Sequence, residues 1–156
     1  MKLFSIMILY RGDPAGHLLK AAYDLTSFGF FQRGTVQEFI NMTAKILVER
    51  TQIGERQSVK EKEYTCHVFV RSDSLAGVCL SDDDYPQRVV HTMLTKIMED
   101  FTNQVIEKLR RKEISVFCKA NPNFLVISNY CTNFIYFRSQ GICGLNKKKS
   151  MVTMAH

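Results

Sequence analysis

Residues 63–80, EYTCHVFVRSDSLAGVCL, decide the fold that the sequence predicts. From position 64 to position 71 the side chains alternate with the period of two that is typical of a β-strand. The polar residues 72–74 predict a turn, and residues 75–80 predict a second strand. Because apolar side chains stand on both faces of this hairpin, we expect a sheet that is covered by a helix on each side.

The overall composition is that of one globular domain. The chain has 156 residues, of which 46% are hydrophobic and 23% are charged, so it is long enough for a core and is not disordered throughout. Its net charge of +6 lies entirely after residue 110, since residues 1–110 hold 14 basic and 14 acidic side chains. A neutral body with a basic tail argues against a dedicated nucleic-acid-binding protein.

The cysteines and the apolar runs indicate a cytoplasmic protein. Five cysteines are an odd number, and no signal peptide is evident because Arg11 and Asp13 follow the first apolar run directly. We therefore expect a reducing environment, with Cys66 and Cys79 acting as small buried hydrophobes. No run reaches the roughly 20 apolar residues that a transmembrane helix needs.

The segments on the N-terminal side of the hairpin predict two more strands and a loop. Residues 2–10 predict a buried strand, residues 12–16 a turn and residues 17–26 the returning strand. The loop 27–34 is rich in phenylalanine, and we expect Phe28, Phe30 and Phe31 to pack onto the sheet rather than to bind a ligand. Residues 56–62 alternate in charge and predict an edge strand.

A first helix is predicted over residues 35–53. Thr35 and Glu38 have the spacing of a capping box, and Gly54 would supply the left-handed stop. The inner stripe is predicted to be Val36, Ile40, Thr43 and Leu47, and a second apolar set widens it: Phe39, Met42, Ile46 and Ile53. The widened stripe indicates either deeper packing or a docking groove, and the residues alone favour packing.

A second helix is predicted to begin at Pro86 and to continue to about Lys112. The three acids before it, at positions 82–84, could suggest a metal site, but they lack ligand spacing and are better explained by the positive end of the helix dipole. The resulting order β-β-α-β-β-β-α predicts an α/β fold, a three-layer α/β/α sandwich.

At this level of detail the sequence resembles a longin domain, specifically that of the dually lipidated (prenylated and palmitoylated) R-SNARE, a synaptobrevin-like v-SNARE. The resemblance covers residues 1–106 and is carried by these stretches: MKL (1–3), LLKAAYD (18–24), SF (27–28), FFQR (30–33), VQEF (36–39), VER (48–50), SVKE (58–61), CHV (66–68), DSLAGV (73–78) and YP (85–86). It implies a longin, profilin-like α+β fold whose five-stranded antiparallel sheet has the order 2-1-5-4-3, with one helix on each face.

The resemblance also implies a function. Longin domains of this SNARE fold back on their own SNARE helix and lipid, as regulatory modules of vesicle-mediated and ER–Golgi transport. The implied binding groove for a SNARE helix or a lipid acyl chain comprises Phe39, Met42, Ile46 and Ile53, so the resemblance reverses the preference for plain packing. Met42 occupies a position at which relatives carry phenylalanine. The implied location is the cytoplasm and, peripherally, Golgi and vesicle membranes.

The C-terminal part departs from this family. Residues 112–156 show neither the heptads of a SNARE motif nor a prenylation box, and Cys143 lies too far from the end to be lipidated. We therefore expect a longin domain over residues 1–111 and a non-homologous, basic and poorly ordered tail, as in a truncated or alternative form. Residues 124–137 could form a strand or an interfacial segment, and weak contact with anionic membranes is possible through Lys147, Lys148 and Lys149.

Two other functions stay open at this stage. An S-acyltransferase-like activity is suggested by Cys66 beside His67, but neighbouring strand residues point to opposite faces, so we expect no enzyme and no cofactor. An adaptor or tethering-complex subunit would keep the fold and form stable hetero-oligomers.

Overall fold

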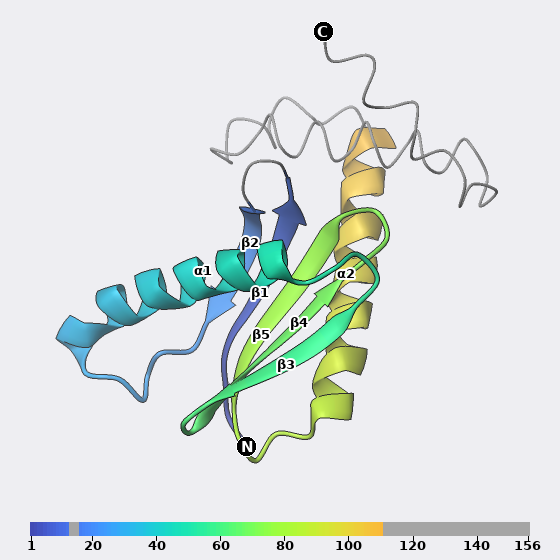
Figure 1. The fold of residues 1–156 in the computed structure, drawn as a ribbon. Helices are drawn as coiled ribbons and strands as arrows, with labels where there is room; N and C mark the ends of the chain where they lie inside the picture. The colour runs from blue at the N-terminus through green and yellow to red at the C-terminus, as the bar shows by residue number, and fades with distance from the viewer. Residues whose placement is uncertain (13–15, 111–156) are drawn as a thin grey trace, which may run out of the picture.

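The computed structural model describes residues 1–12 and 16–110, which form one five-stranded antiparallel sheet between two long helices (Figure 1). The elements in chain order are β1 (Leu3–Arg11), β2 (Gly16–Tyr23), the short 3-10 helix η1 (Phe30–Gln32), α1 (Arg33–Arg50), β3 (Arg56–Glu61), β4 (Tyr64–Val70), β5 (Leu75–Asp82) and α2 (Gln87–Arg110). The strand order is β2-β1-β5-β4-β3, as predicted. The expected features of residues 112–156, including the segment 124–137, lie outside the described residues.

The hairpin that the alternation predicts is confirmed. Strands β4 and β5 pair antiparallel from Tyr64 opposite Asp82 to Val70 opposite Ala76. Ser74 closes the turn with a φ of 67°, in the left-handed region that a non-glycine residue adopts uncommonly. Strand β5 continues into the centre of the sheet by pairing with β1, so the hairpin joins its two halves.

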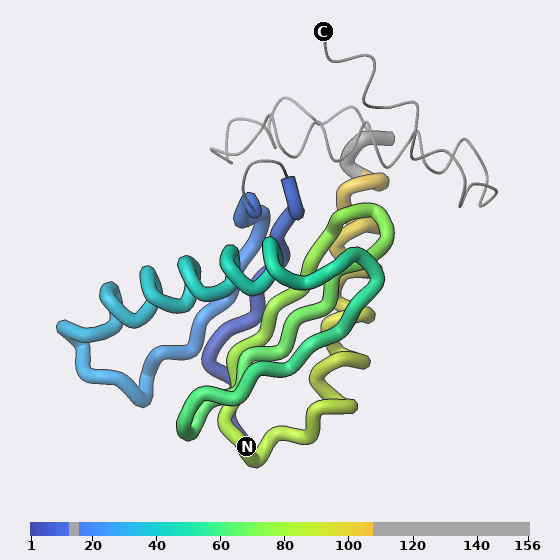
Figure 2. Tube along the Cα trace, in the orientation of Figure 1, coloured from blue at the N-terminus to red at the C-terminus, as the bar shows by residue number. Residues whose placement is uncertain are grey.

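The alternation of side chains divides the core into two layers. Strand residues on one face pack against Ile40, Ala44 and Val48 of α1, and those on the other face pack against α2. In Figure 2 the two helices cross the sheet on opposite sides. The α1 layer is built from Met7, Leu9, Leu25, Ile40, Ala44, Val48, Val68, Val70, Ala76 and Val78. The α2 layer is built from Ile8, Leu19, Phe69, Leu75, Cys79, Val90, Leu94, Met98, Phe101 and Val105.

Helix α2 approaches the sheet closely at Gly77 of β5. A Cβ atom at this position would lie 3.2 Å from Cδ2 of Leu94 and 3.3 Å from Sδ of Met98. Leu94 and Met98 are buried and are one helical turn apart, so they straddle the strand at this point. The absence of a side chain at Gly77 therefore sets how closely α2 packs on β5.

The start of α1 differs from the prediction. The helix begins at Arg33 and not at Thr35, and none of the described side chains caps it, so the predicted capping box with Glu38 is wrong. The reason is local: η1 runs directly into α1, with the backbone N–H of Gln32 bonded to the carbonyl of Gly29 at 2.8 Å. Thr35 thus lies inside the first turn, whereas a capping side chain must come from the residue that precedes it.

The end of α1 also differs. The helix stops at Arg50, three residues before the predicted end, because Thr51 turns the chain into an extended conformation. Both the backbone N–H and the hydroxyl of Thr51 donate to the carbonyl of Leu47, at 2.9 and 2.7 Å. Gly54 does adopt the left-handed conformation, with a φ of 88°, but it serves the turn into β3 by donating to the carbonyl of Val70.

The phenylalanine-rich loop is only partly buried. Phe28 packs against the core, with its ring 5.9 Å from that of Phe4 and 6.5 Å from that of Tyr64. Phe30 and Phe31 are 77% and 94% exposed, so the expectation that they pack onto the sheet is wrong. Since Phe28 fills the space beside Phe4 and Tyr64, the η1 turn directs the next two rings away from the sheet.

Candidate functional site

The outer surface of α1 carries an apolar ridge formed by Phe39, Met42 and Ile46. Their spacing of three and four residues places all three on one side of the helix. That side lies opposite the buried stripe of Ile40, Ala44 and Val48, so the inner stripe is rotated relative to the predicted one. Phe39 is 63% exposed and Met42 is 55% exposed, and Ile46 is exposed as well.

Ile53, the fourth predicted site residue, is separate from the ridge. It is exposed, but it lies beyond the end of α1 in the segment that leads to β3. The structure therefore brings three of the four predicted residues together on one helix. Exposure, which docking requires, is established for all four side chains.

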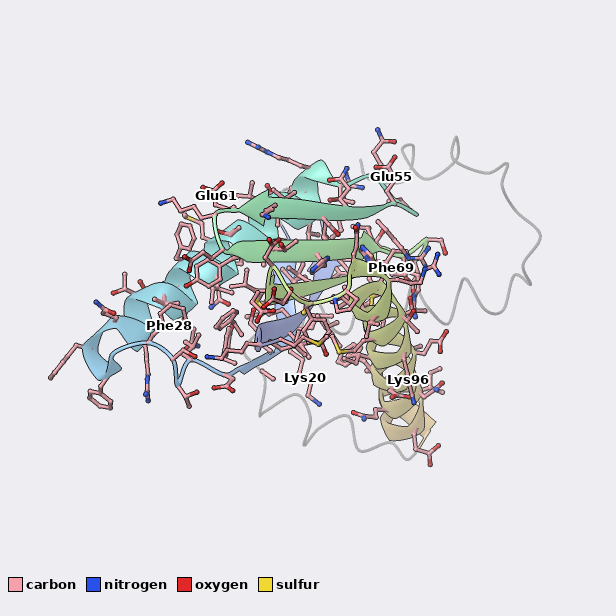
Figure 3. The ribbon with its side chains drawn as sticks, turned by 90° about the horizontal axis from the view of Figure 1, so that it is seen from below. Lys20, Phe28, Glu55, Glu61, Phe69 and Lys96 are labelled. Atoms are coloured by element: carbon pink, nitrogen blue, oxygen red, sulfur yellow. The ribbon has the colours of Figure 1, made fainter. Side chains whose placement is uncertain are left out.

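A further exposed apolar residue, Val59, was not anticipated because the sequence of β3 reads as a polar edge strand. Val59 pairs with Cys66 of β4, which puts it on the same face of the sheet as α1. Helix α1 packs mainly on β2, β1, β4 and β5, and it leaves β3 largely uncovered on that face. Figure 3 marks the two ends of this outer strand by Glu55 and Glu61.

Polar contacts on the side of α1 that faces β2 hold the helix in place. The Tyr23 hydroxyl donates to Oδ1 of Asn41, and burial raises the pKa of this phenol. Glu49 accepts from the backbone N–H of Gly16 through Oε1 at 3.2 Å, and its carbonyl accepts from Arg11 at 3.2 Å. The ridge is therefore presented by a helix that is anchored along its other side.

The structure also contains a cavity on the opposite face of the sheet. It has a volume of about 320 Å³ and lies between α2 and the first two strands. Its lining includes Ile6, Ile8, Ala22, Ile97 and Phe101, with Lys20 and Asp100 also contributing. Since none of the four predicted site residues lines it, this cavity is distinct from the surface of α1.

The geometry gives no support to a catalytic pair of Cys66 and His67. Cys66 pairs with Val59 on the α1 side of the sheet, whereas His67 hydrogen-bonds to Ser58 and Ser81 on the α2 side. Burial raises the pKa of the Cys66 thiol to about 11, which disfavours the nucleophilic thiolate. Within residues 1–12 and 16–110, no three metal-ligating side chains come together either.

Comparison with known proteins is decisive for the family. The sequence model of the longin family, described as "Regulated-SNARE-like domain", matches residues 25–119. The chain belongs to the longin domain family. The described part has the five-stranded antiparallel sheet and two helices of an α/β longin fold.

The similar relatives indicate which longin proteins this domain resembles. It is 50% identical over 102 residues to "Synaptobrevin homolog ykt6" of Schizosaccharomyces pombe. The matched residues make up 65% of this chain and 51% of that protein. It is 42% identical over 101 residues to "Synaptobrevin homolog YKT6" of Yarrowia lipolytica, covering 65% and 50%. The longin domain is thus of the ykt6-like R-SNARE type, and the chain spans about half the length of these relatives.

These findings support a regulatory module of SNARE-type trafficking. In the part of the chain that the structure describes, no helix combines the length and apolar character needed to cross a bilayer.

Proposed function

We propose that this longin domain regulates SNARE assembly by binding an amphipathic SNARE-motif helix, or a lipid acyl chain, along the apolar ridge of α1. The observation that carries the proposal is the exposure of Phe39, Met42 and Ile46 on one side of a firmly anchored helix. Amphipathic helices bind such surfaces through apolar anchors that recur every three or four residues, which matches the spacing of the ridge. The binding would take place peripherally at Golgi and vesicle membranes.

The energetics favour an apolar ligand. Each of these side chains exposes a large apolar surface to water, and covering it contributes about 25 cal/mol per Å². Val59, which lies on the face of the sheet that α1 covers, provides additional exposed apolar surface, and Ile53 is exposed beyond the end of α1. The helix that docks would be supplied by a SNARE motif of this or another molecule.

The test is Met42→Glu in the full chain, with the binding of a SNARE-motif peptide measured by calorimetry. Met42 is more than half exposed, so the variant should keep its free energy of unfolding within about 0.5 kcal/mol. Peptide binding should weaken at least about tenfold, because a carboxylate would be buried under the ligand. Asn103→Glu, which places the same side chain on an exposed site of α2, is the matched control and should bind normally.

Unchanged binding by Met42→Glu would contradict the proposal. A prenylated or acylated peptide without a SNARE motif, tested on the same two variants, identifies whether the ridge takes a lipid chain. Loss of binding by Asn103→Glu but not by Met42→Glu would move the site to the α2 side of the sheet.

We also propose a weak contact with anionic membranes through Lys147, Lys148 and Lys149, which lie outside the described residues. The support is the net charge of +6 after residue 110. Flotation with anionic and neutral liposomes tests it, since binding should require anionic lipid and should fall when the three lysines are changed to alanine. Equal flotation with both lipids would contradict it.

A further inference from the structure

Four polar side chains form a hydrogen-bonded row between the outer strands and α2, which we call the histidine bridge: Ser58, His67, Ser81 and His91. Oγ of Ser58 lies 2.8 Å from Nδ1 of His67 and 3.2 Å from Nε2 of His91. Nε2 of His67 lies 3.2 Å from Oγ of Ser81. The row thereby connects β3, β4, β5 and α2 through side chains alone.

The register of the sheet places these groups together. Ser58 lies directly opposite His67, and Ser81 lies opposite Thr65, two residues from His67 on the same face. His91 comes from the second turn of α2, and its ring stands edge-on to that of His67 with centroids 5.6 Å apart. His67 is only 1% exposed, so the centre of the bridge is shielded from water.

The hydrogen bonds fix one arrangement of the protons. Ser81 donates its hydroxyl proton to the carbonyl of Asp82, so it must accept from His67, which therefore carries its proton on Nε2. Nδ1 of His67 is then an acceptor, and the hydroxyl of Ser58 donates a hydrogen bond to it. Ser58 must accept in turn from Nε2–H of His91, which leaves Nδ1 of His91 as a buried acceptor without a hydrogen-bond partner among the described residues.

This arrangement favours neutral rings over charged ones. A proton added to Nδ1 of His91 would point into a buried site at which no described residue offers an acceptor. A proton added to Nδ1 of His67 would reverse the hydrogen bond with Ser58, whose hydroxyl would have to give up its donation to His67 and accept from both rings. Either event places a positive charge in this buried row without a carboxylate to compensate it, and so destabilises the closed contact between β3 and α2.

The charged neighbours do not compensate such a proton. On β3, Arg56 is positive and disfavours charging His91, while the ammonium of Lys60 is paired with Asp83. On β5, Cys79 stands opposite His67 as a protonated thiol, with its pKa raised to about 12 by burial. On the face of the sheet that α2 covers, His67 is the one titratable side chain of β4. On α2, Arg88 lies one turn before His91 and is positive. Within the described residues no carboxylate hydrogen-bonds to either ring.

We propose that the histidine bridge is a pH-sensitive latch, which fastens β3 and the first turns of α2 to the sheet in neutral solution and releases them in mildly acidic solution. Burial lowers the pKa of both His67 and His91; the neighbouring ring of His91 lowers the pKa of His67 further, and the positive charge of Arg56 lowers that of His91 further. Because the open state binds protons more readily than the closed one, the latch is fully closed above the ordinary histidine pKa of about 6.5 and weakens as the pH falls below it. This inference does not depend on the proposed function of α1.

The experiment is native-state hydrogen exchange on the full chain at pH 7.5 and 5.5, corrected for the intrinsic exchange rate. Each histidine weakens the closed state about tenfold per pH unit below its ordinary pKa, so opening of β3 and of the start of α2 should increase by up to about a hundredfold. Strands β1 and β2 should keep their protection. His91→Gln keeps a donor for Ser58 but removes one titration, and should reduce the increase to about tenfold.

Two further variants complete the test. Ser58→Ala removes the central hydroxyl and should open β3 and the start of α2 already at pH 7.5. His17→Gln changes a histidine of β2 outside the bridge and should behave like the unchanged protein. The proposal is overturned if His91→Gln leaves the pH dependence unchanged, if acid lowers protection equally in all strands, or if nitrogen NMR at neutral pH finds either ring protonated on Nδ1.

Discussion

The packing of α2 on the sheet can be tested by filling the space above Gly77 with one methyl group. In Gly77→Ala the new Cβ would lie 3.2 Å from Leu94 and 3.3 Å from Met98, closer than ordinary van der Waals contact. Overpacking of a buried contact costs about 1–3 kcal/mol. The replacement of glycine also lowers the conformational entropy of the unfolded chain, which stabilises the folded protein by only about 0.4–1 kcal/mol. We therefore expect a net loss of roughly 0.5–2 kcal/mol from these two terms.

The cost of Gly77→Ala should fall when the side chain of Leu94 is shortened. Leu94→Ala alone removes a fully buried side chain and should cost about 2–5 kcal/mol. It also removes the nearest atom to the new methyl and gives Met98, the other close neighbour, space to move, so Gly77→Ala in this background should cost less than in the unchanged protein. The measurement is a double-mutant cycle by urea unfolding of the full chain, with an expected coupling of about 0.5–3 kcal/mol.

Gly34→Ala is the matched control for the cycle. Gly34 lies in the first turn of α1, and a methyl group added there would meet no atom of the described residues within 4 Å, so the change should stabilise by up to about 1 kcal/mol in both backgrounds. An equal effect of Gly77→Ala with and without the Leu94 side chain would refute the close approach of α2 to β5.

Three other properties are open to direct measurement. Tyr23→Phe should cost about 0.5–1.5 kcal/mol in thermal or urea unfolding, since it leaves Asn41 without its donor. Cys66 should react slowly with a thiol reagent at pH 8, because a pKa of about 11 leaves on the order of a thousandth of the Cys66 side chains as thiolate. Rapid labelling of Cys66 in the folded protein would contradict this. Phe31→Ser should leave stability within about 0.5 kcal/mol, whereas a larger loss by the same unfolding measurement would show that this ring packs.

Much of the fold could be predicted because its signals are local. The alternation over residues 64–71 and the turn before Leu75 determine the central hairpin, and both depend only on neighbouring residues. The ends of α1 could not be predicted as well. There the capping signal of Thr35 competes with a 3-10 turn, and Thr51 ends the helix before the glycine that the sequence favours.

The ridge could be predicted in part. The wide apolar arc of α1 indicated surplus hydrophobic surface, but only the resemblance to longin domains favoured exposure of Phe39 and Met42 over packing. The exposure of Phe31 was missed because Phe28 takes the available space, which depends on tertiary contacts. The histidine bridge joins Ser58 to His91, 33 positions away, and no local pattern could reveal that contact.

The position of β1 between β2 and β5 has a consequence for synthesis on the ribosome. Tyr10 pairs with Leu75 and Leu3 pairs with Ser81, so β1 gains its second neighbour only after most of the domain has been translated. Until then the nascent chain presents an unpaired strand edge, which is the kind of surface that chaperones protect and that aggregation exploits. Slowing translation before codon 75 should therefore lower the yield of folded protein more than an equal delay after codon 82.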